Sequence, residues 1–283
     1  MTAGGPALLS GTELAARIRA GLAAEVASAG RLRPGLAVVV AGDDPASAVY
    51  VSMKEKACAK VGIAGTVVRL GGDAAASDVI GAVRSLNEDP SVDGILCQLP
   101  LPAHVSEGDV ARAIDPGKDV DGLHPENVGR LWRGEDGLFP CTPLGIMALL
   151  EEHRIRLEGA RVLVIGRSDI VGKPVAALML RANATVTLAH SRSADLRGLC
   201  RESDVVVAAA GRPGLVTGDF LKPGAVVVDV GITRTPAGLA GDVDFPSAAR
   251  TAGAITPVPG GVGPLTIAFL LSNTLRAWRN HIS

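Results

Sequence analysis

The chain is poor in aromatic side chains, net charge and long apolar runs. Phenylalanine, tryptophan and tyrosine together make up 2% of its 283 residues. The formal net charge is -1, so the surface has no basic excess that would favour nucleic acid. No apolar run approaches the roughly 18 residues that a membrane helix needs. The first residues lack the basic flank and apolar core of a secretory signal. We therefore expect a soluble, cytoplasmic protein without a membrane or nucleic-acid partner.

The cysteines are few and widely spaced, which argues against a metal centre. Cys58, Cys97, Cys141 and Cys200 include no close pair. Three of the four stand in apolar surroundings, as core thiols do in a reducing compartment. We expect no bound metal. With 47% hydrophobic and 20% charged residues, the chain has the composition of a globular protein of one large or two ordinary domains.

Short apolar runs rich in β-branched residues alternate with helical stretches in both halves of the chain. Continuous apolarity is typical of strands buried on both faces, as in parallel sheets covered by helices. The repeated alternation predicts an α/β protein of two lobes, the second a Rossmann-like parallel sheet, with a cleft between the lobes. We place strands at 36–41, 66–70, 94–98, 161–165, 184–188, 204–208 and 225–230, and helices at 45–61, 77–87, 144–153, 173–182 and 265–282.

The join between the lobes is predicted at residues 136–143. Pro143 can begin a helix that Thr142 caps, and this helix would cross from one lobe to the other. The predicted domains are therefore 1–141, joined by the C-terminal helix 265–283, and 142–264. Residues 2–7 are small or Gly/Pro-containing, and we expect them to be disordered.

Tyr50 and Lys54 are the most informative pair in the first lobe. If Pro45 opens a helix, the two side chains lie one turn apart on the same face. A phenol beside an amine suits proton transfer, or stacking on a flat substrate. Such pairs are also common on ordinary amphipathic helices. The spacing by itself leaves both interpretations open.

A buried strand at the start of the second lobe runs into a glycine-containing turn. Gly166 ends the strand, and Gly172 and Pro174 stand near the start of the next helix. Backbone amides and a helix N-terminus in this arrangement can bind a pyrophosphate. The spacing departs from GxGxxG, because Ser168 stands two residues after Gly166. It also differs from a Walker A loop, because five residues separate Gly166 from Gly172 and Pro174 stands where that loop needs Ser or Thr. Strand, turn and helix together predict a dinucleotide site.

The next strand ends in a basic segment that favours NADP over NAD. An acidic residue at this point binds the ribose of NAD, whereas an arginine accommodates the 2′-phosphate of NADP. Here Ser191 and Arg192 occupy the position, and Arg167 is available from the first turn. The alternative is an ordinary exposed basic loop. His190 alone does not indicate catalysis.

Three further segments carry unusual combinations of polar, Gly and Pro residues. Residues 93–102 end a buried strand with Gln98 before two prolines, and residues 118–124 place acids in a glycine turn. Residues 255–264 form a Pro- and Gly-rich loop before the last helix. Each segment alone could simply form a turn, because Gly, Pro and Asp are common turn residues.

Taken in this order, the motifs resemble the bifunctional methylenetetrahydrofolate dehydrogenase/cyclohydrolase family (FolD type). The resemblance covers the chain from about Leu8 to the last helix. It consists of YxxxK at 50–54, VDGxxxQLPLP at 92–102, KDVDG at 118–122, GRSxxVGxP at 166–174 and PGGVGP at 259–264.

The resemblance implies oxidation of methylenetetrahydrofolate by NADP and hydrolysis of the methenyl product to 10-formyltetrahydrofolate, within one-carbon metabolism and purine biosynthesis. It also implies a homodimer. It makes Lys54 the central catalytic group, and Tyr50 stacks on the aminobenzoyl ring of the substrate. By this resemblance, Gln98 contacts Lys54, and Asp121 forms hydrogen bonds with the pterin. The further residues implied are Leu99, Pro259, Gly260 and Gly261 for the substrate, and Gly166, Arg167, Ser168, Gly172, Ser191, Arg192 and Ile232 for the cofactor.

Other functions remain possible from the sequence. A non-catalytic NADP-sensing module would keep the fold, but it would not need Tyr50, Lys54, Gln98 and Asp121 together. A P-loop hydrolase is disfavoured by the glycine spacing and by Pro174. A third alternative is a dehydrogenase that uses NAD and does not catalyse hydrolysis. Arg167, Ser191 and Arg192 argue against NAD, and Lys54 together with Gln98 argues against the loss of hydrolysis.

Overall fold

The computed structural model describes residues 5–30, 33–236 and 238–282, and these fall into two compact units. Unit 1 comprises residues up to 15 together with 142–266, and unit 2 comprises 16–141 together with 267 onward. Three helices have residues in both units: α1 (Thr12–Ser28), α6 (Cys141–Glu152) and α10 (Gly263–Ile282). Among the described residues, no helix combines the length and apolarity needed to cross a bilayer.

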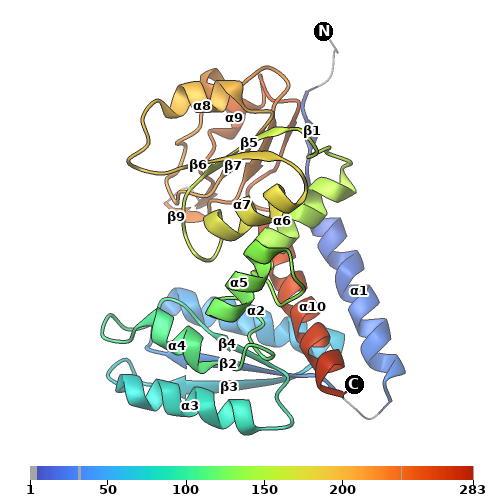
Figure 1. Cartoon of the computed structure of the whole chain (residues 1–283), viewed down its shortest axis with the longest axis vertical. Coiled ribbons are helices and arrows are strands. Elements are labelled where there is room, and N and C mark those ends of the chain that lie inside the picture. Colours follow the sequence, from blue (N-terminus) through green and yellow to red (C-terminus); the bar gives the residue numbers. More distant parts are fainter. Residues whose placement is uncertain (1–4, 31–32, 237, 283) are drawn as a thin grey trace. The chain divides into compact units, whose positions relative to one another are not determined.

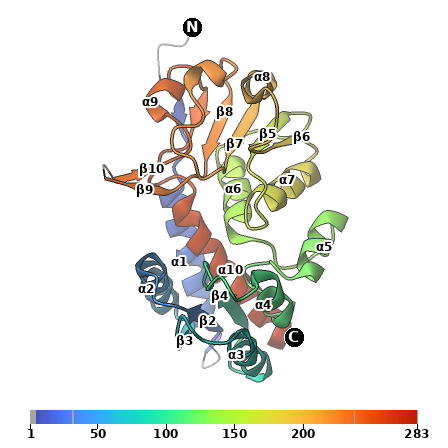
Figure 2. The ribbon, with the colours of Figure 1, turned by 90° about the vertical axis from the view of Figure 1, so that its left-hand side faces the viewer.

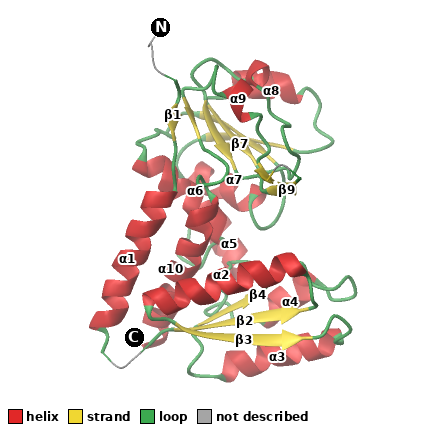
Figure 3. Cartoon of the chain, turned by 180° about the vertical axis from the view of Figure 1, so that it is seen from behind, coloured by secondary structure: helices red, strands yellow, loops and turns green. Residues whose placement is uncertain are grey.

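Unit 2 is built on a parallel sheet of strand order β3-β2-β4 (Figure 3). Alternate residues of the central strand β2 point to opposite faces. Leu36, Val38 and Val40 pack in one core cluster with residues of α1, α2 and α10, whereas Ala37 and Val39 pack in another with residues of α3 and α4. The elements are β2 (Gly35–Ala41), α2 (Pro45–Val61), β3 (Ala64–Leu70), α3 (Ala76–Glu88), β4 (Gly94–Cys97), α4 (Glu107–Ala113) and α5 (Pro125–Arg133).

Helix α2 begins and ends as its sequence predicts. The Asp44 side chain accepts a hydrogen bond from the Ser47 backbone N–H, and proline occupies the first turn. Gly62 ends the helix in the left-handed conformation at φ 88°. These caps fix the bounds of α2, and Tyr50 and Lys54 therefore lie one turn apart on it.

Among the described residues, unit 1 contains a six-stranded parallel sheet of order β1-β11-β8-β7-β5-β6. Helices α8 and α9 lie on the upper side of this sheet in Figure 1 and α7 on the lower side. Strand β5 is flanked by β6 and β7, so successive connections run in opposite directions from it. The carboxyl ends of β5 and β7 form a topological switch point, where α/β sheets bind ligands.

The remaining elements of unit 1 include a hairpin, β9–β10, that projects from the sheet (Figure 2). Its strands follow the end of β8 directly. The bounds in this unit are β1 (Ala7–Leu8), β5 (Arg161–Ile165), α7 (Gly172–Arg181), β6 (Thr185–Ala189), α8 (Leu196–Glu202), β7 (Val205–Ala208), a 3-10 turn (Gly218–Phe220), β8 (Val226–Asp229), β9 (Thr233–Thr235), β10 (Gly238–Ala240), α9 (Phe245–Ala248) and β11 (Ala254–Ile255).

The seven predicted strands all occur, with ends shifted by at most two residues. The predicted domain boundary is wrong at the N-terminus, because β1 pairs with β11 and residues up to 15 therefore belong to unit 1. The same pairing contradicts the predicted disorder at Ala7, while residues 2–4 lie outside the described part of the chain. Helix α1 was not predicted, since its alanine-rich sequence has only a weak apolar periodicity.

Helix α6 begins earlier than predicted, at Cys141, so Thr142 lies inside the helix and does not cap it. The Thr142 hydroxyl instead forms a 2.8 Å hydrogen bond with the Thr266 hydroxyl of α10. Within unit 1, this bond joins the start of α6 to the start of α10.

Candidate active site

Lys54 is held by a neutral amide. Its Nζ donates a 2.8 Å hydrogen bond to Oε1 of Gln98, which follows β4. The Gln98 amide is oriented because Nε2 donates to the Leu99 carbonyl oxygen at 2.7 Å and the backbone N–H donates to the Val39 carbonyl oxygen at 2.8 Å. Tyr50 lies one turn before Lys54 on α2 and is 44% exposed. The structure therefore brings these predicted site residues together in unit 2.

Burial and a nearby carboxylate set the protonation of Lys54. Burial lowers the pKa of the Lys54 amine, against the attraction of Asp121 and the Cys141 thiol. Burial likewise raises the pKa of Asp121, against the attraction of Lys54. Each shift moves the group toward its neutral form. An amine whose neutral form is favoured by burial is suited to accept a proton.

The loop that carries Asp121 is anchored by two earlier residues of its motif. Lys118 Nζ donates to the carbonyl oxygens of Leu86, Asn87 and Asp89 at 3.3, 2.7 and 2.9 Å, at the C-terminal end of α3. Asp119 is fully buried, and its Oδ2 accepts from the His124 backbone and the Asn127 side chain. These anchors leave the Asp121 side chain for the site.

Two residues that the sequence analysis did not assign to the site also contact this loop. Asn273 of α10 is buried, and its Nδ2 donates to the carbonyl oxygens of Val120 and Phe139, both at 2.8 Å. Cys141 is buried, and its Sγ lies 3.3 Å from the Val120 oxygen and 3.7 Å from Asp121 Oδ1. A buried asparagine in an apolar helix is the one sequence signal that could have identified this contact.

For the folate and NADP chemistry that the sequence resemblance implies, replacing Asn273 with leucine is expected to raise the folate KM of both implied activities about tenfold, because two backbone carbonyls beside Asp121 lose their donor. The KM for NADP should stay unchanged. Thr274→Val is the matched control, since this buried hydroxyl bonds to Leu270 within the same helix. Steady-state kinetics with a melting curve for each variant would test this, and an unchanged folate KM would contradict it.

In unit 1, the predicted turn after β5 has no room for a side chain at either of its two glycines. Gly166 has φ 122°, and a Cβ there would lie 2.0 Å from the Ala209 carbonyl oxygen. A Cβ at Gly172, the first residue of α7, would lie 2.1 Å from the Gly166 oxygen. Ser168 Oγ accepts from the backbone N–H groups of Val171 and Gly172, at 3.2 and 3.3 Å. The turn thus packs closely against the start of α7, as a pyrophosphate site requires.

The predicted 2′-phosphate residues lie in the turns after β5 and β6. Arg167, Ser191 and Arg192 are exposed. The Arg192 backbone N–H donates to His190 Nδ1 at 3.2 Å, so His190 has a structural contact in this turn. Both guanidiniums are therefore accessible to an anionic ligand.

The predicted substrate loop and Ile232 also belong to unit 1. Ile232 follows β8 and is 47% exposed, and a Cβ at Gly263 would lie 3.4 Å from its Cδ1. The Gly260 carbonyl oxygen accepts from the Gly11 backbone, and the Gly261 N–H donates to Pro257. Pro259, Gly260 and Gly261 therefore lie in a different unit from Lys54. Their contact with substrate stays a prediction.

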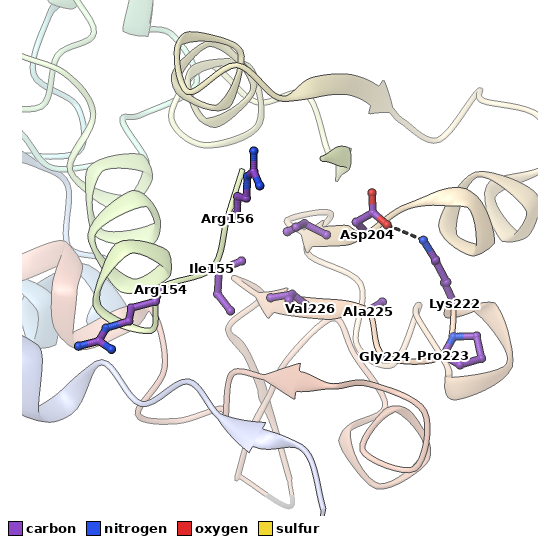
Figure 4. Close-up of a pocket in the computed structure, with 10 residues that line it drawn as sticks. Arg154, Ile155, Arg156, Asp204, Lys222, Pro223, Gly224, Ala225 and Val226 are labelled. Atoms are coloured by element: carbon purple, nitrogen blue, oxygen red, sulfur yellow. Dashed lines mark hydrogen bonds and ion pairs between the residues drawn. The ribbon is translucent and has the colours of Figure 1, made fainter. Parts of the chain in front are cut away.

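A pocket in unit 1 lies away from these residues (Figure 4). It is lined by Arg154, Arg156 and the amino ends of β7 and β8, and Lys222 there is paired with Asp204. Parallel sheets bind ligands at the carboxyl ends of their strands, so this pocket is not the candidate site. Among the described residues, no group of three or more His, Cys, Asp or Glu side chains could hold a metal ion.

Comparison with family models covers most of the chain. Residues 9–121 match the tetrahydrofolate dehydrogenase/cyclohydrolase catalytic domain, and residues 140–282 match the NAD(P)-binding domain of the same family.

Individual relatives agree with this match. The chain is 56% identical to the bifunctional protein FolD of Rhodospirillum rubrum, over 96% of this chain and 97% of that protein. It resembles the crystal structure of the bifunctional FolD enzyme of Campylobacter jejuni with a TM-score of 0.95 and 44% identity, over 96% and 98% of the two chains. It also resembles the Trypanosoma brucei dehydrogenase-cyclohydrolase, solved with NADP and an inhibitor, with a TM-score of 0.94 and 40% identity over 99% of each chain.

Proposed function

Because the chain belongs to the tetrahydrofolate dehydrogenase/cyclohydrolase family, we propose that it oxidises methylenetetrahydrofolate with NADP and hydrolyses the methenyl product to 10-formyltetrahydrofolate. The observation that carries the hydrolytic activity is the Lys54–Gln98 hydrogen bond beside Asp121. A lysine paired with a neutral amide keeps access to its neutral form, which hydrolysis needs and a purely binding role does not.

The residues of unit 1 fit a dinucleotide. The close contacts at Gly166 and Gly172 pack the turn tightly against the start of α7, where a pyrophosphate would bind. Arg167, Ser191 and Arg192 would bind the 2′-phosphate, because exposed guanidinium and hydroxyl groups are suitable donors to it. Ile232 would contribute an apolar contact to the cofactor.

Oxidation requires little acid–base chemistry from the chain. NADP, when bound, supplies the acceptor for the hydride that leaves the methylene carbon. The adjoining folate nitrogens stabilise the cation that forms, so the contribution of the protein is mainly orientation. Tyr50 would stack on the aminobenzoyl ring, and Asp121 would accept from the paired N–H groups of the pterin. Gln98 and Leu99 would border the same ligand.

Hydrolysis requires proton transfers, and in this proposal Lys54 makes them. Water adds to the methenyl carbon, and neutral Lys54 removes one proton from it. The bond from this carbon to one folate nitrogen then breaks as the carbonyl forms, and the second proton of the water ends on that nitrogen. The proton held by Lys54 passes to solvent. In both steps, Gln98 Oε1 orients the Lys54 amine.

The first experiment supplies methylenetetrahydrofolate with NADP or NAD and follows reduced nicotinamide and the methenyl product separately. We expect reduction with NADP and only transient methenyl accumulation. Persistent methenyl would contradict the role of Lys54 in hydrolysis. Reduction with NAD alone would favour a dehydrogenase specific for NAD, and no reduction with either cofactor would favour the sensing module.

Arg192→Ala is expected to raise the KM for NADP by about tenfold or more, because a charge-assisted contact to the 2′-phosphate is lost. The KM for NAD should change little, since NAD lacks this phosphate. Arg156→Ala, at the other edge of the same unit, is the matched control. Equal changes for NADP and NAD would contradict the assignment.

The family resemblance further supports a cytoplasmic homodimer that acts in purine biosynthesis. Strand β6 is one of the two edges of the sheet among the described strands of unit 1, and most of its residues are exposed or half-buried. An unpaired edge can pair with a second copy. Sedimentation equilibrium would test the dimer, and a monomer at micromolar concentration would exclude it.

A further inference from the structure

Two buried aspartates lie beside each other near the carboxyl ends of β7 and β8. Asp229 is the last residue of β8, and Asp242 follows β10; the two residues are 4% and 0% exposed. The Asp242 backbone N–H donates to Asp229 Oδ1 at 2.8 Å. A carboxylate buried without donors would be costly, so the partners of this pair indicate what the pair holds.

Asp242 holds the segment that follows β7. Its Oδ2 accepts from the backbone N–H groups of Ala210 and Gly211 at 2.6 and 2.9 Å, and its Oδ1 accepts from Arg212 at 2.7 Å. Three consecutive amides therefore converge on one carboxylate. Hydrogen bonds to an ionised acceptor are stronger than those between neutral groups.

Asp229 holds the segment that follows β8. Its Oδ1 accepts from Gly231 at 3.0 Å and its Oδ2 accepts from Val243 at 3.0 Å, in addition to the Asp242 bond. A Cβ at Gly231 would lie 2.4 Å from Asp242 Cγ, and one at Gly241 would lie 1.9 Å from Asp229 Oδ2. The glycines on either side of the hairpin thus make room for the pair.

The segments held in this way adjoin the predicted cofactor residues. The Ala209 carbonyl, next to the amides bound by Asp242, is the group that Gly166 packs against. Ile232 follows the Gly231 amide bound by Asp229. Both segments follow the carboxyl ends of neighbouring strands, and the segment after β7 lies at the switch point of the sheet.

We propose that Asp242 and Asp229 are positioning residues for the cofactor: the two buried carboxylates fix the backbone after β7 and β8 in the shape that receives the dinucleotide. This assignment rests on the proposed function. It assigns to the pair no contact with the reacting atoms, and it explains why two like charges are buried together. Their mutual repulsion is offset by six backbone donors, which serve the geometry of the cofactor edge.

Asp242→Asn is the direct test. The amide keeps the size of the side chain but presents an NH₂ group to one of the converging backbone donors. We expect the KM and Kd for NADP to rise about tenfold or more. Hydrolysis of methenyltetrahydrofolate without NADP should stay within about twofold, because Lys54 and Gln98 lie in unit 2.

Asp204→Asn is the matched control in the same unit. Asp204 also accepts a backbone N–H, that of Arg161, but at the amino ends of the strands. The NADP KM of the Asp204→Asn variant should not change. A folded Asp242→Asn variant with an unchanged NADP KM would overturn the assignment, as would an equal effect of Asp204→Asn. If the wild-type enzyme reduced no nicotinamide, the proposed function would fail, and NADP Kd values would still test the positioning role.

Amide hydrogen exchange of the wild-type enzyme gives a test that needs no variant. The N–H groups of Ala210, Gly211 and Arg212 should exchange slowly without NADP, although they lie outside strands and helices. Fast exchange of all three without NADP would contradict preorganisation by Asp242, whether or not Asp242→Asn folds.

Discussion

Lys54→Met is expected to reduce hydrolysis of methenyltetrahydrofolate by about 10²–10⁴-fold, the usual range for loss of a general acid–base group. Methionine keeps the length of the side chain and removes the amine that Gln98 orients. Dehydrogenase activity should fall less, because oxidation depends on orientation more than on proton transfer. The measurement is single-turnover decay of methenyltetrahydrofolate, which isolates the hydrolytic step.

Lys56→Met, an exposed position on the same helix, is the matched control and should leave hydrolysis unchanged. Hydrolysis that proceeds at the wild-type rate in Lys54→Met would exclude Lys54 as the base, whatever the effect on oxidation.

The pH dependence of hydrolysis follows from the same residue. Burial lowers the pKa of Lys54 below its usual value of 10.5. Below the lowered pKa the amine is protonated and cannot accept a proton from water, so kcat should rise with pH and level off above that pKa. This rising limb should be absent from the residual activity of Lys54→Met. A wild-type rate that is flat with pH would contradict a neutral lysine as the base.

Asp121→Asn is expected to raise the folate KM of both activities together, by roughly 10- to 100-fold. The asparagine has the same shape, but it offers one acceptor and one donor where the pterin presents two N–H donors. The KM for NADP should remain near the wild-type value. Steady-state kinetics of each activity, with each substrate varied in turn, measures the change.

Asp109→Asn is the control for Asp121, since Asp109 is an exposed aspartate on α4 that pairs with Arg112. It should alter neither KM. A change in only one of the two activities of Asp121→Asn would show that Asp121 acts on the chemistry of that step rather than on shared folate recognition.

Local sequence determined the elements that need only near neighbours along the chain. Asp44, a proline in the first turn and Gly62 are sufficient to start and end α2, so the Tyr50–Lys54 spacing could be predicted as a shared helix face. The buried strands could be predicted because both faces of a parallel sheet are apolar. The glycine turn after β5 could be predicted because its backbone must approach α7 closely.

Tertiary structure decided the contacts that join distant segments. Gln98 reaches Lys54 only because β4 lies next to β2 in the sheet, and Asn273 reaches Val120 across 153 positions of the chain. The pairing of β1 with β11, which are also distant in sequence, places residues 5–15 in unit 1. The sequence thus determined which groups are available, because helix ends, turns and buried strands depend on local chemistry. Which groups meet, and hence the pKa of Lys54 and the six amides on Asp229 and Asp242, depended on how strands and helices pack.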